Sequence, residues 1–402
     1  MNIICVASYF KGGEFLRECK RQGAHVELLT KQKSLHENWP REDLDNVVAL
    51  PDDSNAELLT YAVSQIARRR KIDCLVALEE FDVINTALVR EHLRLPGPDS
   101  RTARRFRDKL TMRAVAHGDG IRVPEFVHAL NYQELDAFMK RVPPPWVLKP
   151  RSDVSAAGIK KLSDAEQVWR AIDVLDAREA LQDKTSYYLL ERYVAGEVFH
   201  VDSLVEQGKV IFAGVSRYGR PPMDVAHRGG VFTSRTIEYD SKDYRELTKL
   251  NRRLLKSMGL EHGAAHAEFI KSAEGGEFYF LEVASRVGGA YIAETLEAAS
   301  GVNLWREWAR IELARVRGQS VGKLEPRREY GGIALSLARQ HTPDTSPYDD
   351  PEISYRIDKP YHVGLVVRSP KLERVEELLA CYVKRFEEDF CATAPAPERL
   401  GG

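Results

Sequence analysis

The sequence has few cysteines, and their spacing excludes two common ways of holding a small domain together. The five are Cys5, Cys19, Cys74, Cys381 and Cys391. Their odd number and the lack of a C-x-x-C pair predict neither a zinc knuckle nor a disulfide framework. Reduced thiols are typical of cytoplasmic proteins, so we predict a cytoplasmic location.

The chain also lacks a charge excess and a long hydrophobic run. Its 402 residues include 59 basic and 60 acidic side chains, which give a net charge of −1. We therefore expect no nucleic-acid partner and no membrane partner. The basic runs at 68–71 and 101–109 are interpreted as solvated helix faces. No apolar run approaches the length of a membrane span, and a chain of this length can form two or three domains.

Alternating strands and helices open the chain, but they carry no dinucleotide fingerprint. Apolar strands are predicted at 2–7, 25–29, 47–50 and 74–78, with helices near 13–23 and 56–69. This order predicts a small parallel sheet covered by helices. The pair Gly12-Gly13 lacks the G-x-G-x-x-G spacing, so NAD is not predicted. The run Glu79-Glu80-Phe81-Asp82 follows a strand and is either a ligand contact or an acidic helix start.

Proline and glycine mark further boundaries. Leu95-Pro96-Gly97-Pro98 is interpreted as the end of the first domain. Beyond it, the patterns predict helices at 101–119, 243–259 and 293–316, and strands from 121 and at 146–150, 188–193 and 209–216. The first of these helices places Asp108-Lys109 in its middle. The tail from 331 alternates short strands with a helix near 373–386 and resembles a small appended unit, and 394–397 is expected to be disordered.

Residues 266–289 carry two glutamates on a predicted hairpin. Apolar segments at 267–270 and 278–283 flank a polar run with two adjacent glycines. Because side chains alternate along a strand, Glu268 and Glu282 can lie together on one face. Mg²⁺ would relieve their repulsion, since it binds one or two carboxylates together with water and phosphate oxygens. A solvent-facing hairpin with ordinary surface charges is the alternative.

A loop of small residues follows strand 146–150. It spans 151–159 and contains Ser152, Ser155 and Gly158, with Lys149 at its mouth. The backbone N–H groups of such a loop can cradle phosphate oxygens, and the lysine supplies positive charge. An ordinary connecting loop is the alternative interpretation.

Two other segments are candidates for binding roles, the bend that follows strand 188–193 and the loop at 218–230. Strand 188–193 runs through a glycine into a second strand, which predicts a hairpin or a sharp bend with Glu191 and Glu197 on either side. The loop at 218–230 is long and irregular and ends in His227-Arg228-Gly229-Gly230. Loops of this length are often functional, so we expect a role for it.

Four elements stand in an order that resembles one family. They are Asp108-Lys109 before a Val-Pro strand start, Lys149-Pro150 with its Ser/Gly loop, Glu191-x-x-Val194-x-Gly196-Glu197, and His266-x-Glu268 paired with Glu282-x-Ala-x-Arg286-x-Gly-Gly. This ordered set resembles the ATP-grasp superfamily of carboxylate–amine ligases over roughly residues 1–320. It is most similar to the branch of L-amino-acid ligases that form dipeptides.

The resemblance implies a fold that combines α/β and α+β domains. We expect an N-terminal parallel-sheet, Rossmann-like domain at 1–98 and an ATP-grasp small lid subdomain at 99–187. The large subdomain at 188–322 would hold the Mg²⁺ and ATP site. Residues 323–402 would form a small C-terminal α+β extension with a flexible tail.

The resemblance also implies a role for each matching residue. ATP would be bound by Lys109, Lys149, Ser152, Ser155, Gly158, Glu191, Val194 and Glu197. Mg²⁺, or Mn²⁺ in its place, would be held by Glu268 and Glu282. Catalytic roles would fall to Arg286 and His266. Substrate would contact His227, Arg228, Gly229, Gly288 and Gly289.

One departure from the family pattern concerns the metal. Many members have asparagine two residues after the second glutamate, where it helps to bind a second ion, and here that position is Ala284. The dipeptide-forming branch and some purine-pathway relatives are similar to this chain in lacking that asparagine. The number of metal ions therefore stays open.

The function implied is ATP-dependent joining of a carboxylate to an amine. The acid would be an amino acid or a similar small acid, activated as an acyl phosphate, with ADP and phosphate released. Two alternatives remain: an ATP-grasp enzyme acting on bicarbonate, formate or a purine intermediate, and a non-catalytic ATP-binding relative. Many relatives are dimers, which leaves a homodimer as an option.

Overall fold

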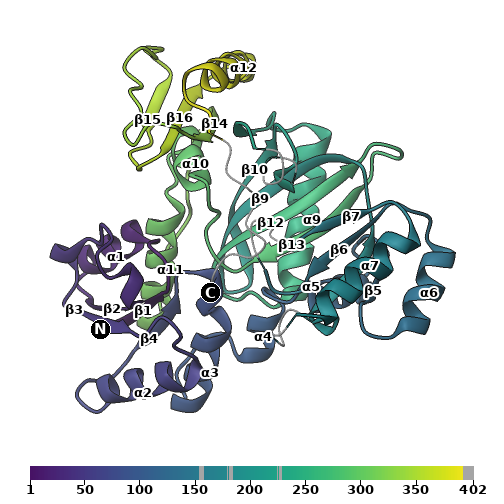
Figure 1. Ribbon diagram of the computed structural model, residues 1–402. Coiled ribbons are helices and arrows are strands. Elements are labelled where there is room, and N and C mark those ends of the chain that lie inside the picture. The colour runs from purple at the N-terminus through teal and green to yellow at the C-terminus, as the bar shows by residue number, and fades with distance from the viewer. Residues whose placement is uncertain (154–157, 179, 181–183, 224, 226–228, 393–402) are drawn as a thin grey trace.

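Three sheets organise the chain, as shown in Figure 1. The computed structural model describes residues 1–153, 158–178, 180, 184–223, 225 and 229–392. A parallel sheet of four strands lies at one side, an antiparallel sheet of four strands lies at the other, and an eight-stranded sheet stands between them. The predicted combination of α/β and α+β architecture is confirmed.

The N-terminal sheet has the predicted parallel strands. Its strands are β1 (Asn2–Ala7), β2 (His25–Lys31), β3 (Asn46–Leu50) and β4 (Cys74–Ala77), in the order β3-β2-β1-β4. The helices are α1 (Gly13–Arg21), α2 (Ala56–Ala67) and α3 (Val83–Leu93), with short 3-10 turns η1 (Gln32–Ser34), η2 (Arg41–Asp43) and η3 (Glu80–Asp82). The η3 turn follows β4 at the carboxyl edge of the sheet, where open α/β sheets bind ligands.

The second four-stranded sheet, called the lid sheet here after the predicted lid subdomain, is antiparallel and carries its own core. Its strands are β5 (Phe126–His128), β6 (Trp146–Pro150), β7 (Lys160–Leu162) and β8 (Tyr188–Arg192), in the order β5-β8-β6-β7. Its helices are α6 (Tyr132–Arg141) and α7 (Ala165–Asp176), and the turn η5 (Thr185–Tyr187) precedes β8. Phe138, Leu148 and Ile172 pack together in the core beneath the two helices.

The eight-stranded sheet forms the centre of the molecule. Its order is β13-β12-β9-β10-β11-β14-β16-β15. The bounds are β9 (Gly196–Glu206), β10 (Lys209–Tyr218), β11 (Phe232–Thr236), β12 (Gly263–Ser272), β13 (Phe278–Ala284), β14 (Tyr330–Leu337), β15 (Ile353–Arg356) and β16 (His362–Ser369). The remaining helices after the lid are α9 (Lys242–Met258), α10 (Ile292–Ser300), α11 (Leu304–Arg317) and α12 (Leu372–Asp389). The predicted amphipathic helix near 243–259 is therefore confirmed as α9.

The helix predicted at 101–119 is wrong in one respect. The chain forms α4 (Ser100–Arg104) and then α5 (Lys109–Gly118), and Asp108 lies between them rather than within a helix. The Asp108 carboxylate accepts a hydrogen bond from the backbone N–H of Leu110 at 3.0 Å, so it caps the new helix. The following strand starts at Phe126 rather than at 121, because Pro124 has no N–H for a ladder bond.

The prediction of a single helix at 293–316 is also wrong. Gly301 adopts a left-handed φ of 77° and ends α10, and the side chain of Asn303 then caps α11. The prediction that Trp305 and Trp308 are core contacts is confirmed, since both are buried. They belong to a cluster that includes Phe15 of α1, so α11 joins the N-terminal sheet to the central one.

The link from 193 to 195 is a bend and not a hairpin. Strands β8 and β9 belong to different sheets, so the chain crosses from the lid to the central sheet at this point. A Cβ at Gly196 would lie 1.9 Å from the carbonyl oxygen of Lys271, so only glycine allows β9 to approach β12 there.

The C-terminal strands extend the central sheet instead of forming a separate one. Residues of β14 pair with β11, for example Ile333 with Ser234, and β16 pairs with β14 in turn. The predicted helix of the tail is confirmed as α12, and residues 394–397 lie outside the described part of the chain. Among the described helices, none combines the length and the apolar character that a membrane crossing needs.

Candidate functional site

A cavity of about 450 Å³ opens where the three sheets meet. Its lining comes from α5, β6 and β8 on the lid side, from β9, β10, β12 and β13 of the central sheet, and from η3 of the N-terminal domain. The cavity therefore collects side chains that are far apart in the sequence. Clefts between domains are common places for small-molecule sites.

The two hairpin glutamates face this cavity from neighbouring strands. Glu268 on β12 pairs directly with Glu282 on β13, which confirms the predicted hairpin register. The Tyr218 hydroxyl donates to Glu268 Oε1 at 2.7 Å, and Lys109 Nζ lies 2.9 Å from Glu282 Oε2. Lys109 also donates to the carbonyl oxygen of Asp153, at the start of the small-residue loop.

A buried ion-pair network connects α5 to the lid strands. Lys149 Nζ lies 2.5 Å from Glu191 Oε1, and Arg113 Nε donates to Glu191 Oε2 at 3.0 Å. The side chain of Arg113 is completely buried. Burial lowers the pKa of Lys149 to about 8, and the positive charge of Arg113 adds to this shift.

Arg286 is held by a carboxylate of the N-terminal domain. Its Nη2 lies 2.6 Å from Glu80 Oε2, and Arg107 Nη1 lies 2.7 Å from Glu80 Oε1. Burial would raise the pKa of Glu80, but the two arginines outweigh that effect and lower it to about 2. Arg107 also donates to the carbonyl oxygen of Ser152, so the cluster links three parts of the cavity wall.

A second buried network lies behind the hairpin. His266 Nδ1 donates to Asp202 Oδ1 at 2.8 Å, and His200 Nδ1 donates to Asp202 Oδ2 at 2.6 Å. The other ring nitrogen of His266 lies 3.5 Å from Glu268 Oε1. Burial would lower the pKa of His266, but Asp202 and Glu268 together raise it to about 10. This network orients His266 toward the glutamate pair.

Two groups of residues could hold a metal ion. Glu268 and Glu282 offer hard carboxylate oxygens at the cavity wall, which suits Mg²⁺. His200, Asp202 and His266 also bring ligand atoms close together, but both Nδ1 atoms are committed to hydrogen bonds with Asp202. The glutamate pair is the better fit, because Mg²⁺ prefers oxygen and the histidine group is already satisfied.

Most of the predicted site residues share the cavity. Those that line it are Lys109, Lys149, Glu191, Val194, His266, Glu268, Glu282, Arg286 and Gly289. Gly288 lies beside them, since a Cβ there would be 2.7 Å from Asp202 Oδ1. Ser152 enters through its carbonyl oxygen, and Gly158 adopts a left-handed φ of 69° within the same loop.

Other predicted residues lie elsewhere. The Glu197 carboxylate is exposed and forms an ion pair with Arg217, and neither Glu197 nor Gly229 is among the described residues that line the cavity. Ser155, His227 and Arg228 lie outside the described residues.

Sequence reasoning did not assign several residues that the structure brings to the site. They are Glu80, Arg107, Arg113, His200, Asp202 and Tyr218. The position of Glu80 after a strand was visible, but its arginine partners were not. His200 and Asp202 share one face of β9, because residues two apart in a strand point the same way. This alternation could have predicted from the sequence that His200 and Asp202 lie on the same face.

Two protein families match this chain. Residues 142–294 match the ATP-grasp domain family, and residues 16–97 match the ATP-grasp N-terminal domain family. The chain is 23% identical over 295 residues to an L-arginine-specific L-amino acid ligase of Bacillus subtilis. That alignment covers 72% of this chain and 69% of the relative.

Solved structures with this fold include enzymes of more than one kind. L-amino acid ligase from Bacillus licheniformis superposes with a TM-score of 0.74 at 18% identity, covering 97% of this chain and 98% of that one. N5-Carboxyaminoimidazole synthetase from Staphylococcus aureus, complexed with ADP, has a TM-score of 0.73 at 14% identity, covering 94% and 96%. At these identities the likeness concerns the fold.

Proposed function

Because this chain is an ATP-grasp enzyme of the ADP-forming carboxylate–amine ligase class, we propose that its acid substrate is an amino acid. The observation that carries this proposal is the pairing of Glu268 with Glu282 in a cavity that also holds Lys109, Lys149 and Arg286. The similarity to an arginine-specific amino acid ligase supports the choice of acid.

The reaction follows from these residues in two steps. The acid carboxylate attacks the γ-phosphorus of ATP, a P–O bond forms to the acid, and the bond to ADP breaks. The amine nitrogen then attacks the acyl carbon, a C–N bond forms, and phosphate leaves as the nitrogen loses a proton. Lys149 and Arg286 carry charge that stabilises the transferring phosphoryl group, and Lys109 orients the phosphates.

Mg²⁺ bound by Glu268 and Glu282 would neutralise phosphate charge as the phosphoryl group transfers. Tyr218 and His266 hold Glu268 in place, and Lys109 holds Glu282. Glu191 and the backbone of Val194 would contact the adenine, in the part of the cavity nearest to the lid strands.

The position of Glu80 gives Arg286 a fixed orientation. Its carboxylate accepts from both Nε and Nη2 of Arg286, so the guanidinium cannot rotate freely. Its Nη1 donates to the carbonyl oxygen of Val287, the residue before the glycine pair at 288–289. We propose this segment as the contact for the acid substrate.

The test is ADP and phosphate release from ATP and Mg²⁺ across a matrix of amino-acid pairs, with mass detection of the products. Release that requires one pair, with a product equal in mass to their sum minus water, is the expected result. Release that responds to bicarbonate or formate instead would overturn the choice of an amino acid. Binding of MgATP without turnover for any acid would leave a non-catalytic relative.

Two further proposals concern the setting of the enzyme. All five cysteines are free thiols, three of them buried, which supports the cytoplasmic location predicted from the sequence. We also propose a homodimer as the unit to test first by sedimentation at several protein concentrations.

A further inference from the structure

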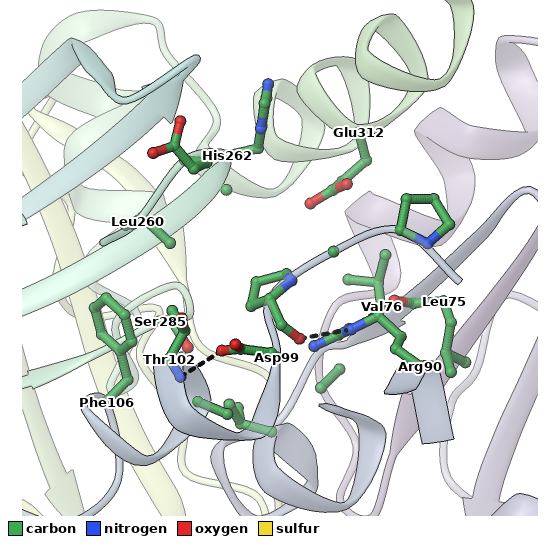
Figure 2. A pocket seen from close by; sticks show the side chains of 18 of the residues that line it. Leu75, Val76, Arg90, Asp99, Thr102, Phe106, Leu260, His262, Ser285 and Glu312 are labelled. Atoms are coloured by element: carbon green, nitrogen blue, oxygen red, sulfur yellow. Dashed lines mark hydrogen bonds between the residues drawn. The ribbon is translucent and has the colours of Figure 1, made fainter. Parts of the chain in front are cut away.

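A second cavity, of about 430 Å³, lies between the N-terminal domain and the central sheet (Figure 2). Its walls come from β4, α3, α4 and α11, from the turn at 259–262 and from the residue after β13. It is nearly as large as the cavity of the proposed active site, and it shares no lining residue with it. Nothing in the ligase chemistry uses it.

Arg90 gives this cavity a buried positive charge that forms no direct ion pair within the described chain. The residue is 6% exposed, and its guanidinium donates to the carbonyl oxygens of Leu75 at 2.8 Å and Pro98 at 3.1 Å. Among the described residues, no carboxylate lies within ion-pair distance of it; Glu312 attracts it from farther away and is itself paired with Arg315. Burying a cation without an anion is costly, so a ligand carboxylate would be stabilised here.

The other walls match the rest of an amino acid. Leu75, Phe106 and Leu260 provide apolar surface, and Figure 2 shows Asp99 and Glu312 on the same cavity as Arg90. Arg315 neutralises Glu312 at 2.9 Å. The exposed Asp99 carboxylate forms no ion pair within the described chain, and it caps α4 by accepting from the backbone N–H of Thr102 at 2.7 Å. A cation without an ion pair, a capping carboxylate that can still accept from an ammonium, and an apolar wall are the features that recognise a zwitterion with a carbon side chain.

A short segment separates the two cavities. Ala284 and Arg286 line the proposed active site, whereas Ser285 between them lines the second cavity. Likewise Phe106 lines the second cavity, and its neighbour Arg107 binds Glu80 and the carbonyl oxygen of Ser152. A ligand that presses on Ser285 or Phe106 therefore acts on residues joined directly to the groups that hold Arg286 and the phosphate loop.

We propose that this second cavity is a regulatory site for an α-amino acid in its zwitterionic form, which binds its carboxylate to Arg90 and its ammonium near Asp99. Occupancy changes the affinity of the active site for nucleotide through Ser285 and Phe106. This goes beyond the proposed function and does not rest on it, because binding can be measured without turnover.

The first experiment measures thermal unfolding of the full chain with each common L-amino acid and no nucleotide. We expect at least one to raise the Tm by roughly 2 °C or more, because a ligand that binds only the folded state stabilises it. The rise should persist in Arg286→Met and disappear in Arg90→Met. Arg104→Met is the matched control, since Arg104 is an exposed arginine on α4, and it should behave as the natural chain does.

The chemical class is tested with two analogues of the best amino acid. The deaminated acid and the decarboxylated amine should each give a much smaller rise in Tm. A rise with the acid equal to that with the amino acid would overturn the zwitterion, and no rise with any amino acid would overturn the site. A rise that is lost in Arg286→Met and kept in Arg90→Met would place the ligand in the active site and overturn the proposal.

Trp308 offers a second measurement on the natural chain, should Arg90→Met fail to fold. Its indole lines the cavity, so binding should change the tryptophan fluorescence, and Trp308→Phe should remove that change. An unchanged fluorescence spectrum at an amino-acid concentration that raises the Tm would overturn the location of the site.

The regulatory role is tested by the Kd of MgADP with and without the amino acid. We expect roughly a five-fold change or more, and an unchanged Kd would overturn it.

Discussion

The two cavities differ in how their charges are balanced. In the proposed active site, Lys109, Lys149 and Arg286 each lie within 3 Å of a carboxylate oxygen. In the second cavity, Arg90 meets only backbone carbonyl oxygens. Paired charges keep a site organised before its substrates arrive, whereas a buried charge without an ion pair can take a ligand of opposite charge. The first arrangement suits catalysis, and the second suits the sensing of a small molecule.

The strongest test of the difference between the two cavities removes one of the two carboxylates proposed to bind Mg²⁺. Glu282→Gln should lower the rate of ADP formation by about 10²–10³, because phosphoryl transfer depends on charges placed around the phosphates. The rise in Tm caused by the amino acid at Arg90 should stay. The measurement is steady-state ADP release together with thermal unfolding. Glu274→Gln is the matched control, since Glu274 is an exposed glutamate on the same hairpin, and its rate should be normal. Near-normal turnover in Glu282→Gln would falsify the metal assignment.

The next largest effect on activity is expected from a change in the buried network of Asp202, His200 and His266. Asp202→Asn removes the charge that orients His200 and His266, and His266 in turn contacts Glu268. Loss of a residue that supports a metal ligand usually costs about 10–100-fold in metal affinity or activity. We expect the Mg²⁺ concentration for half-maximal rate to rise accordingly, measured by titration at saturating ATP. Asp243→Asn, which breaks the ion pair with Lys271 and leaves the histidine network intact, is the control. An unchanged Mg²⁺ requirement would show that the network is structural only.

The ionisation of Lys149 should make nucleotide binding depend on pH. Its pKa of about 8 means that the charge is present at pH 7 and is lost as the pH rises through 8. The Kd of MgATP should therefore rise roughly tenfold between pH 7 and pH 9. Loss of folded protein would not explain this rise in Kd. The pKa of Lys149 is lower in the folded state than in the unfolded state, so its contribution to the free energy of unfolding increases with pH over this window. Lys149→Arg should give a flat profile, and an equally steep one would mean that another group titrates.

The last comparison concerns stability, and the smallest change is expected for Arg90. Arg90→Met removes two hydrogen bonds but also an unneutralised buried charge, so the free energy of unfolding should fall by about 2 kcal/mol or less. Glu80→Gln leaves two arginines without their carboxylate and should cost about 3 kcal/mol or more. Urea unfolding of both variants measures the difference. A larger loss for Arg90→Met than for Glu80→Gln would reverse the contrast between the two cavities.

The sequence predicted the hairpin and its glutamates because their signals are local. Alternating side chains and a glycine pair set the partners of Glu268 and Glu282 within a span of a few residues, and the N-terminal strands followed in the same way. The break at Asp108 was missed because a single capping side chain outweighed the helical pattern around it. The chain order of the four family motifs supplied the fold.

Tertiary structure alone decided how the charges are paired. Glu80 and Arg286 are separated by 206 positions, and no periodicity connects them. Whether a buried arginine meets a carboxylate, as Arg286 does, or only carbonyl oxygens, as Arg90 does, depends on which strands and helices the domains bring together. Electrostatic energy depends on distance in space, and a sequence records only distance along the chain.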